Sequence, residues 1–210
     1  MSTSDAGPGG SPSRDTPYGR RISDPGALRA LAHTGRYAIM EKLQADGPAT
    51  ATECAQVAGL SPSACSYHLR LLAKHGFVEP DDSRDHDGRE RVWRAVITSW
   101  VSDPDPDADR GQAGAVDAML ARVMLAASDA KVLDFADRAA AEPEWREAAL
   151  MSNSTVVATV DELREISAAL MAVLRPYFRT ARPLEDAPEG ARRVHMSIRM
   201  APEPPPPGTA

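Results

Sequence analysis

Residues 47–94 read GPATATECAQVAGLSPSACSYHLRLLAKHGFVEPDDSRDHDGRERVWR, and this stretch decides the fold. Its pattern predicts two helices joined by a turn at 59–63, because Gly59 ends the first helix and Ser61 caps the second. An apolar pair after Gly76 and the turn dipeptide Asp87-Gly88 then indicate a charged hairpin. A helix that is polar and slim on one side, with a ribbon beside it, is the arrangement with which a winged helix reads DNA.

Further helices precede this pair. Asp24-Pro25 predicts a helix start, and apolar residues at helical spacing predict another helix over 36–45. The capping box Thr50-x-x-Glu53 opens the first helix of the pair, which runs to residue 58. With hairpin strands expected at 77–81 and 89–96, the first domain covers residues 22–100.

The residues after 111 follow a different pattern. A helical apolar stripe covers 112–140, and a second capping box, Thr159-x-x-Glu162, opens a helix with its own apolar stripe. The segments 154–159 and 192–200 predict strands, the second through its clean alternation of apolar and polar side chains. We therefore expect a mainly helical α+β chain, in which a winged helix-turn-helix precedes a smaller α/β dimerisation or effector domain at 112–200.

Segments of low complexity bound these two domains. Residues 1–21 and the proline-rich residues 201–210 have too few apolar side chains to offset chain entropy, so both predict disordered tails. Asp-Pro repeats followed by glycine predict a linker at 101–111. No run approaches about 18 apolar residues and the N-terminus has no apolar leader, which argues against a membrane span and a signal peptide. With two cysteines, both in predicted helices, we expect a reduced, cytoplasmic protein.

The distribution of charge is compatible with DNA binding although the net charge is −6. Residues 20–98 contain 11 basic and 10 acidic side chains, whereas the rest of the chain contains 13 and 20. The acidic excess therefore lies outside the expected DNA-binding domain. Because phosphate contacts dominate affinity for DNA, we expect modest binding that depends strongly on salt.

Six short motifs occur together along residues 22–98: Ala27–His33 (ALRALAH), Thr52–Ala55 (TECA), Gly59–Ser61 (GLS), Ser66–Leu72 (SYHLRLL), Gly76–Glu79 (GFVE) and Asp87–Arg89 (DGR). As a set they resemble the winged-helix repressors of the ArsR family. The resemblance implies a homodimeric transcriptional regulator whose binding to DNA changes when an effector binds. Thr50 and Thr52 occupy the positions at which metal-sensing relatives carry cysteines, and threonine does not ligate a soft metal. Thr34 replaces the proline usual after Ala32-His33.

The predicted recognition helix supplies most of the candidate DNA contacts. Small side chains let its backbone approach the bases, serines suit phosphates, and arginine bonds guanine or phosphate. The wing adds arginines that share one strand face, although neighbouring acids oppose them, and a cross-strand charge network is the other interpretation. The candidate DNA-binding residues are Ser61, Ser63, Ala64, Ser66, Tyr67, Arg70, Arg89 and Arg91.

The second half predicts a dimer interface and leaves room for an effector pocket. Its two long apolar stripes suggest packing across a two-fold axis, which a palindromic operator requires. An adaptable apolar pocket for a small organic molecule could form where large side chains converge, although ordinary core packing is the alternative. The candidate pocket residues are Met119, Met124, Trp145, Met151, Tyr177 and Phe178.

Catalytic motifs are absent from the sequence. It has no nucleophile elbow, phosphate loop or zinc-protease motif, so we expect no enzymatic activity, no metal and no cofactor. Cys54 is expected in the core, and Cys65 near the groove-facing side, where it would be open to oxidation. We expect a homodimeric repressor that binds double-stranded DNA. The alternatives are a winged-helix protein-interaction module that avoids DNA, and a ligand-binding or enzymatic second half beside a vestigial DNA reader.

Overall fold

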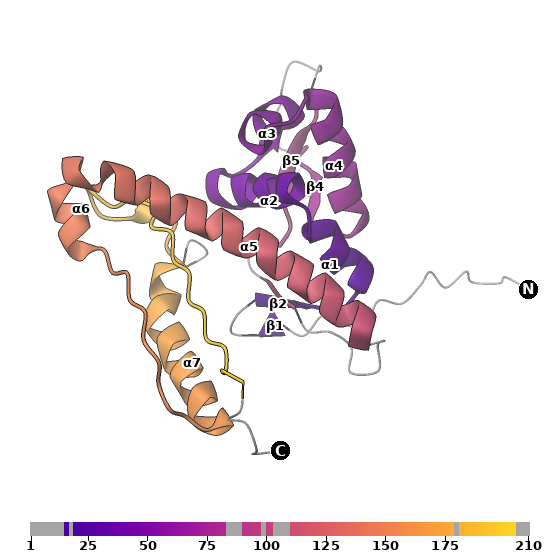
Figure 1. The fold of residues 1–210 in the computed structure, drawn as a ribbon. Helices are drawn as coiled ribbons and strands as arrows, with labels where there is room; N and C mark the ends of the chain where they lie inside the picture. The colour runs from indigo at the N-terminus through magenta and orange to yellow at the C-terminus, as the bar shows by residue number, and fades with distance from the viewer. Residues whose placement is uncertain are drawn as a thin grey trace, which may run out of the picture.

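The computed structural model describes residues 15–16, 19–82, 90–97, 100–102, 110–178 and 181–204 of the chain (Figure 1). Four helices form the first half: α1 (Pro25–Leu31), α2 (Thr34–Asp46), α3 (Ala51–Ala58) and α4 (Pro62–Lys74). Each begins at a side-chain cap that satisfies free backbone N–H groups. Asp24 caps α1, and the capping box Thr50–Glu53 opens α3 as predicted. Gly59 ends α3 in the left-handed region at φ 63°.

A small antiparallel sheet completes the winged helix. Its strands are β3 (Ala49–Thr50), β4 (Val78–Pro80) and β5 (Val92–Ala95), in the order β3-β5-β4. The hairpin prediction is therefore confirmed, with a third short strand that the pattern did not reveal. The register places Glu79 opposite Arg94. The predicted turn at Asp87-Gly88 lies outside the described residues.

The core of the molecule lies between these helices and the sheet. Leu31, Ile39, Leu69 and Leu72 are fully buried, and Phe77 is 1% exposed. They come from α1, α2, α4 and the start of the hairpin, so the core holds α4 in place from three sides. Removing apolar surface from water on this scale is the main stabilising contribution to such a domain.

A second sheet lies at the edge of the domain and corrects two expectations. Strands β1 (Asp15–Thr16) and β2 (Gly19–Ile22) are antiparallel, and β2 pairs in parallel with β6 (Trp100–Ser102). The tail predicted at 1–21 therefore ends in two strands, and the linker predicted at 101–111 begins in a third and ends in a helix. Composition missed this because strand pairing satisfies the backbone of a segment that has few apolar side chains.

Helix α5 (Arg110–Arg138) crosses the domain and packs on α1 and α2 (Figure 1). Val116 and Leu120 are buried near its start, but Met119 is 44% exposed. The apolar stripe predicted over 112–140 therefore contacts the core of the winged helix only in the first third of α5. Beyond it follow a 3₁₀ turn, η1 (Ala139–Ala141), and the short helix α6 (Pro143–Ala148).

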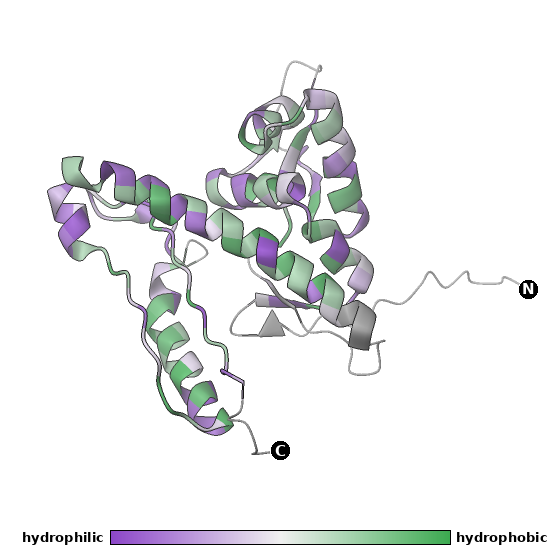
Figure 2. Cartoon of the chain, in the orientation of Figure 1, coloured by the Kyte–Doolittle hydropathy of each residue, from purple (hydrophilic) through white to green (hydrophobic). Residues whose placement is uncertain are grey.

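Helix α7 (Val160–Leu174) lies apart from the winged helix, and Figure 2 shows apolar residues gathered along it. It opens with the predicted capping box Thr159–Glu162 and is followed by η2 (Arg175–Tyr177) and η3 (Leu184–Asp186). The strands predicted at 154–159 and 192–200 are wrong for the described part of the chain, because neither segment forms a ladder with another described residue. Alternation of apolar and polar residues indicates an extended backbone with one apolar and one polar face. A strand also needs a neighbouring strand with which its backbone forms hydrogen bonds. None of the helices described is both long and apolar enough to cross a bilayer.

Candidate nucleic-acid interface

The N-terminal end of α4 is built to meet solvent or a ligand. The Ser61 hydroxyl accepts a hydrogen bond from the N–H of Ala64 at 3.3 Å and lies 3.1 Å from the Ser63 hydroxyl. Pro62 occupies the first helical position, where no N–H is needed. Because the N–H groups of Ala64 and Cys65 are bonded to Ser61, the N–H of Ser63 remains for a ligand at the positive end of the helix, which favours phosphate.

The candidate contacts on α4 share one face of the helix. Its opposite face buries Cys65, Leu69 and Leu72. The six candidates Ser61, Ser63, Ala64, Ser66, Tyr67 and Arg70 are all exposed or half-buried. Spacing of three and four residues therefore separates the core face of α4 from a face that is open to the solvent.

Arg70 is the strongest candidate for a base or phosphate contact. Its side chain is exposed. Within the described residues its guanidinium forms no hydrogen bond or ion pair. Its five N–H donors are consequently available to a ligand without breaking an internal interaction. Tyr67, 59% exposed one turn earlier, offers a flat apolar ring and a hydroxyl on the same face.

Two histidines and an arginine meet where α1, α2 and α4 join. The rings of His33 and His68 lie 4.9 Å apart, and Nη1 of Arg36 lies 3.5 Å from Nδ1 of His68. Arg36 also donates to the carbonyl oxygens of Ala30 and Arg29 at the end of α1. The distance of 35 residues between His33 and His68 carried no signal of their contact.

His33 also caps α2, in place of the usual Ser, Thr, Asn or Asp. Its Nδ1 accepts a hydrogen bond from the N–H of Gly35 at 3.1 Å, so this nitrogen is unprotonated. Burial and the neighbouring Arg36 lower the pKa of His33. Burial, His33 and Arg36 lower the pKa of His68. Both rings are therefore neutral near pH 7, and acid places new positive charges beside Arg36.

Of the two wing candidates, the structure describes Arg91. Arg91 is exposed and its guanidinium lies 5.8 Å from the ring centre of the buried Trp93, a cation–π distance. This contact leaves the N–H groups of Arg91 at the surface. Glu90 accepts a hydrogen bond from Thr52 at 2.7 Å, which attaches the base of the wing to α3. Arg89 lies outside the described residues.

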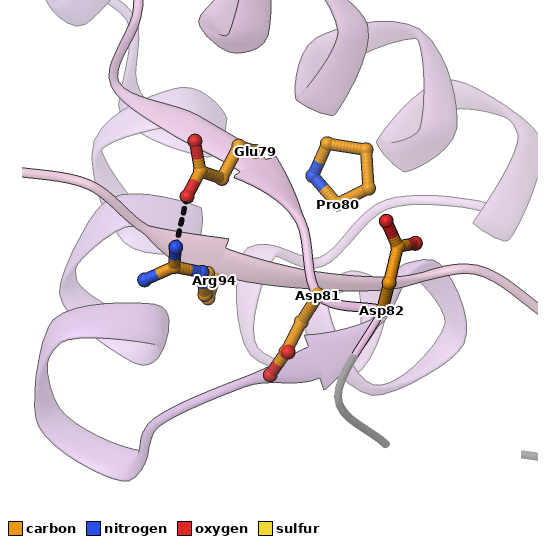
Figure 3. Close-up of a pocket in the computed structure, with 5 residues that line it drawn as sticks. All are labelled: Glu79, Pro80, Asp81, Asp82 and Arg94. Atoms are coloured by element: carbon orange, nitrogen blue, oxygen red, sulfur yellow. Dashed lines mark ion pairs between the residues drawn. The ribbon is translucent and has the colours of Figure 1, made fainter. Parts of the chain in front are cut away.

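A shallow acidic hollow occupies the opposite side of the hairpin (Figure 3). Glu79 and Arg94 form an ion pair across β4 and β5, so Arg94 is not free to bind phosphate. Asp82 follows on the same rim, whereas Asp81 is only 9% exposed. Arg70 and Arg91 are both exposed, so the outer face of α4 and the Arg91 side of the wing are the candidate approach for an anionic ligand.

The two cysteines lie together between α3 and α4. Both are fully buried free thiols, so Cys65 lies in the core beside Cys54 and not on the groove-facing side of α4. The thiol contact with Cys65 and burial raise the pKa of Cys54, whereas the hydrogen bond from Cys54 lowers the pKa of Cys65. Within the described ranges, no group of three or more His, Cys, Asp and Glu side chains is placed to hold a metal ion. Thr50 instead serves as the cap of α3.

The six candidate pocket residues are spread over the second half. Met119, Met124, Met151, Tyr177 and Phe178 are at least 38% exposed. Trp145 lies under the guanidinium of Arg192, 4.6 Å from ring centre to Cζ. An apolar hollow does exist beside α7, but it is lined by other residues: Val160, Leu163, Arg164, Ser167, Leu170, Met171, Ile198 and Met200.

Comparison with known protein families gives one match. A family model described as a helix-turn-helix domain matches residues 31–81, which run from the end of α1 to the first strand of the wing. The match contains α4 and every candidate contact on it. A search of curated proteins found no match. The chain therefore carries a helix-turn-helix domain of the kind found in DNA-binding regulators, a class that is typically not enzymatic.

Proposed function

We propose that the protein is a sequence-specific DNA-binding transcriptional repressor of the ArsR type that acts as a homodimer. The observation that carries the proposal is the exposed face of α4, where Arg70 has no partner among the described residues. The buried side of α4 holds this face in place, and the helix-turn-helix match covers it. A polar, pre-positioned helix with a free arginine is what a major-groove reader requires.

The roles of the residues follow from their positions. Arg70 and Tyr67 contact base edges or the adjacent backbone, and Ser61 and Ser63 bind phosphate at the start of α4. Arg91 contacts the flanking backbone from the wing, and Arg89 is proposed for the same role. Two copies are needed because palindromic half-sites lie about 34 Å apart and one copy reads one half-site.

Regulation by a small organic molecule is part of the proposal. The apolar hollow beside α7 is a more suitable place for such a ligand than the six residues suggested by sequence, because its walls lie on two adjacent segments. Ligand binding would change affinity for DNA only if the ligand favours one arrangement of the two readers over the other. Repression follows the ArsR resemblance, since a bound dimer excludes other proteins from the promoter.

The test is binding to labelled duplexes from the promoter of the protein's own gene, measured at several salt concentrations. We expect specific binding that weakens steeply between about 50 and 200 mM salt, because phosphate contacts release counterions. A promoter duplex with scrambled sequence is the control. Equal affinity for both duplexes at every salt concentration would refute sequence-specific reading.

The hollow lined by Glu79, Asp82 and Arg94 favours a second candidate, a winged-helix module that binds another protein. That function predicts no DNA binding even at low salt. It also predicts that removing the carboxylates abolishes binding of the partner. The same salt series therefore separates the two candidates.

A further inference from the structure

The second half of the chain has no interior of its own. After Ser128 at 7% exposure, none of the described residues up to 204 is buried. Between Leu150 and Met200, 15 large apolar side chains are at least 38% exposed. A segment of this size with so much exposed apolar surface needs something to cover it, because patches of this extent mark interaction sites.

Residues 192–200, which we call the C-terminal arm, are held to the rest of the chain by one set of alternate side chains. Arg193 forms an ion pair with Asp46 and donates to the carbonyl oxygen of Ala45 at 2.7 Å. His195 lies 2.9 Å from the Ser128 hydroxyl, and Arg199 donates to Asp129 at 2.7 Å. The arm is therefore attached to the end of α2 and to the middle of α5 by its polar side.

The other side and the backbone of the arm are open. Val194, Met196, Ile198 and Met200 are 65%, 56%, 46% and 42% exposed, and the last two face the apolar side of α7. Among the described residues, no backbone hydrogen bond joins the arm to another segment. An extended segment with free N–H and C=O groups and one apolar face is an unpaired sheet edge, which pairs readily with another strand.

We propose that the arm pairs with the arm of a second copy of this chain as an antiparallel two-stranded ribbon that covers the apolar sides of both α7 helices. The inference rests on the homodimer of the proposed function and specifies where its two copies join. Two identical strands related by a two-fold axis are antiparallel, so residue numbers across the pair have a constant sum. The register that places Val194 opposite Met200 and Met196 opposite Ile198 keeps every apolar side chain on one face. It also places Ser197 opposite its own copy.

The exposed apolar area of the whole second half is of the size that a specific interface buries. Burying one large apolar side chain removes roughly 60–120 Å² of apolar surface from water, at about 25 cal/mol per Å². The 15 exposed side chains, on average a little over half exposed, therefore offer on the order of 800 Å² per copy. That is about the area each partner contributes to a specific interface of standard size.

A membrane surface fits this half less well than a second copy. Helices that lie on membranes carry Lys and Arg beside their apolar face. Helix α7 carries Asp161, Glu162 and Glu165 against the single base Arg164, so an anionic lipid surface would repel it. The arm is attached to α2 of the reader, so pairing two arms also connects two readers, as a palindromic operator requires.

The test measures the self-association of the full-length chain by sedimentation equilibrium. Ile198→Glu places a charge in the apolar face of the ribbon, and we expect the dissociation constant of the dimer to rise at least about 100-fold, because both copies bury the charge. Ala172→Glu is the matched control, because it adds the same charge on the opposite face of α7 and should leave the dimer unchanged. Hydrogen exchange over residues 31–81 must match that of the natural sequence, which shows that the reader is still folded.

A cross-link tests the register independently. Ser197→Cys should form a disulfide between two copies under a mild thiol oxidant, because directly opposed strand residues bring their Cβ atoms within reach. Ala181→Cys, exposed outside the arm, is the control and should stay uncrosslinked. The buried Cys54 and Cys65 should not interfere.

The possible results separate the inference from the proposed function. A monomeric natural chain overturns the ribbon. So does a dimer that survives Ile198→Glu and whose Ser197→Cys variant forms no disulfide between copies. A dimer that depends on the arm but shows no specific binding to DNA supports the ribbon and refutes the repressor. Specific DNA binding by a dimer that does not need the arm supports the repressor and refutes the ribbon.

Discussion

Removing the guanidinium of Arg70 gives the most direct test of DNA reading by α4. Arg70 has no intramolecular partner among the described residues, so Arg70→Ala should change the free energy of unfolding by less than about 0.5 kcal/mol. A bidentate arginine contact with guanine contributes about 1–3 kcal/mol of discrimination. One half-site should therefore lose roughly 5- to 150-fold in affinity, and a full operator bound by two copies should lose about 2–6 kcal/mol.

Arg94→Ala is the control for this experiment, because it removes the same charge from the same domain. Arg94 is paired with Glu79 on the acidic side of the wing, so its loss should cost no more than about 1 kcal/mol of stability and little affinity. Fluorescence anisotropy with specific and scrambled duplexes would measure both variants. If Arg70→Ala weakens the two duplexes equally and lowers the salt slope by about 1, Arg70 binds phosphate. Unchanged affinity on both duplexes would refute the assignment of α4 as the reader.

Three further predictions concern the stability and accessibility of the winged helix. The folded chain lowers the pKa values of His33 and His68, so below about pH 6.5 the unfolded chain binds protons more readily than the folded chain. The free energy of unfolding should therefore fall as the pH decreases from about 6.5 and stay level above it. His33→Asn keeps a capping acceptor but removes the titrating ring. Urea unfolding at pH 7.5 and 5.5 should therefore show a smaller loss of stability for this variant than for the natural chain, and an equal loss would contradict the role of His33 in the pH dependence. Gly59→Ala should lower the free energy of unfolding by about 1–2 kcal/mol, because φ at this position is +63° while the added Cβ meets open space. Gly114→Ala in α5 is the control and should be neutral or stabilising. Equal changes of melting temperature in the two variants would contradict this conformational account. Cys54 and Cys65 should react with an aromatic disulfide reagent only at the rate of unfolding, because both are fully buried; rapid labelling of the native protein would show that α3 and α4 separate.

The winged helix could be predicted from the sequence because its signals are local. Capping at Asp24, Thr50 and Ser61 and the left-handed Gly59 each act within a few residues, and the structure contains all of them. The helical spacing on α4 likewise separated the core face from the exposed face. What the sequence could not supply were contacts between distant segments, such as the histidine pair and the parallel pairing of 19–22 with 100–102.

The second half was harder to predict for a physical reason. Its apolar stripes and alternating segments report which faces avoid water, but they do not say which surface covers them. The pattern in the arm was therefore interpreted as a strand with a partner in the same chain, and the partner is missing there. The prediction of a pocket from six large side chains has the same weakness. Large apolar side chains on separate elements lie together only where those elements pack on a common core.

Helix α5 has a mechanical consequence for any regulator built on this fold. Its 29 residues make a rod about 43 Å long that is anchored by Val116 and Leu120 at one end and carries the second half at the other. From Leu120 to Arg138 the helix extends about 27 Å, so a tilt of about 7° about this anchor moves its far end by about 3.3 Å, close to the rise of one base pair, about 3.4 Å. A rearrangement too small to disturb either reader would thus shift the distance between them by a full step of the operator.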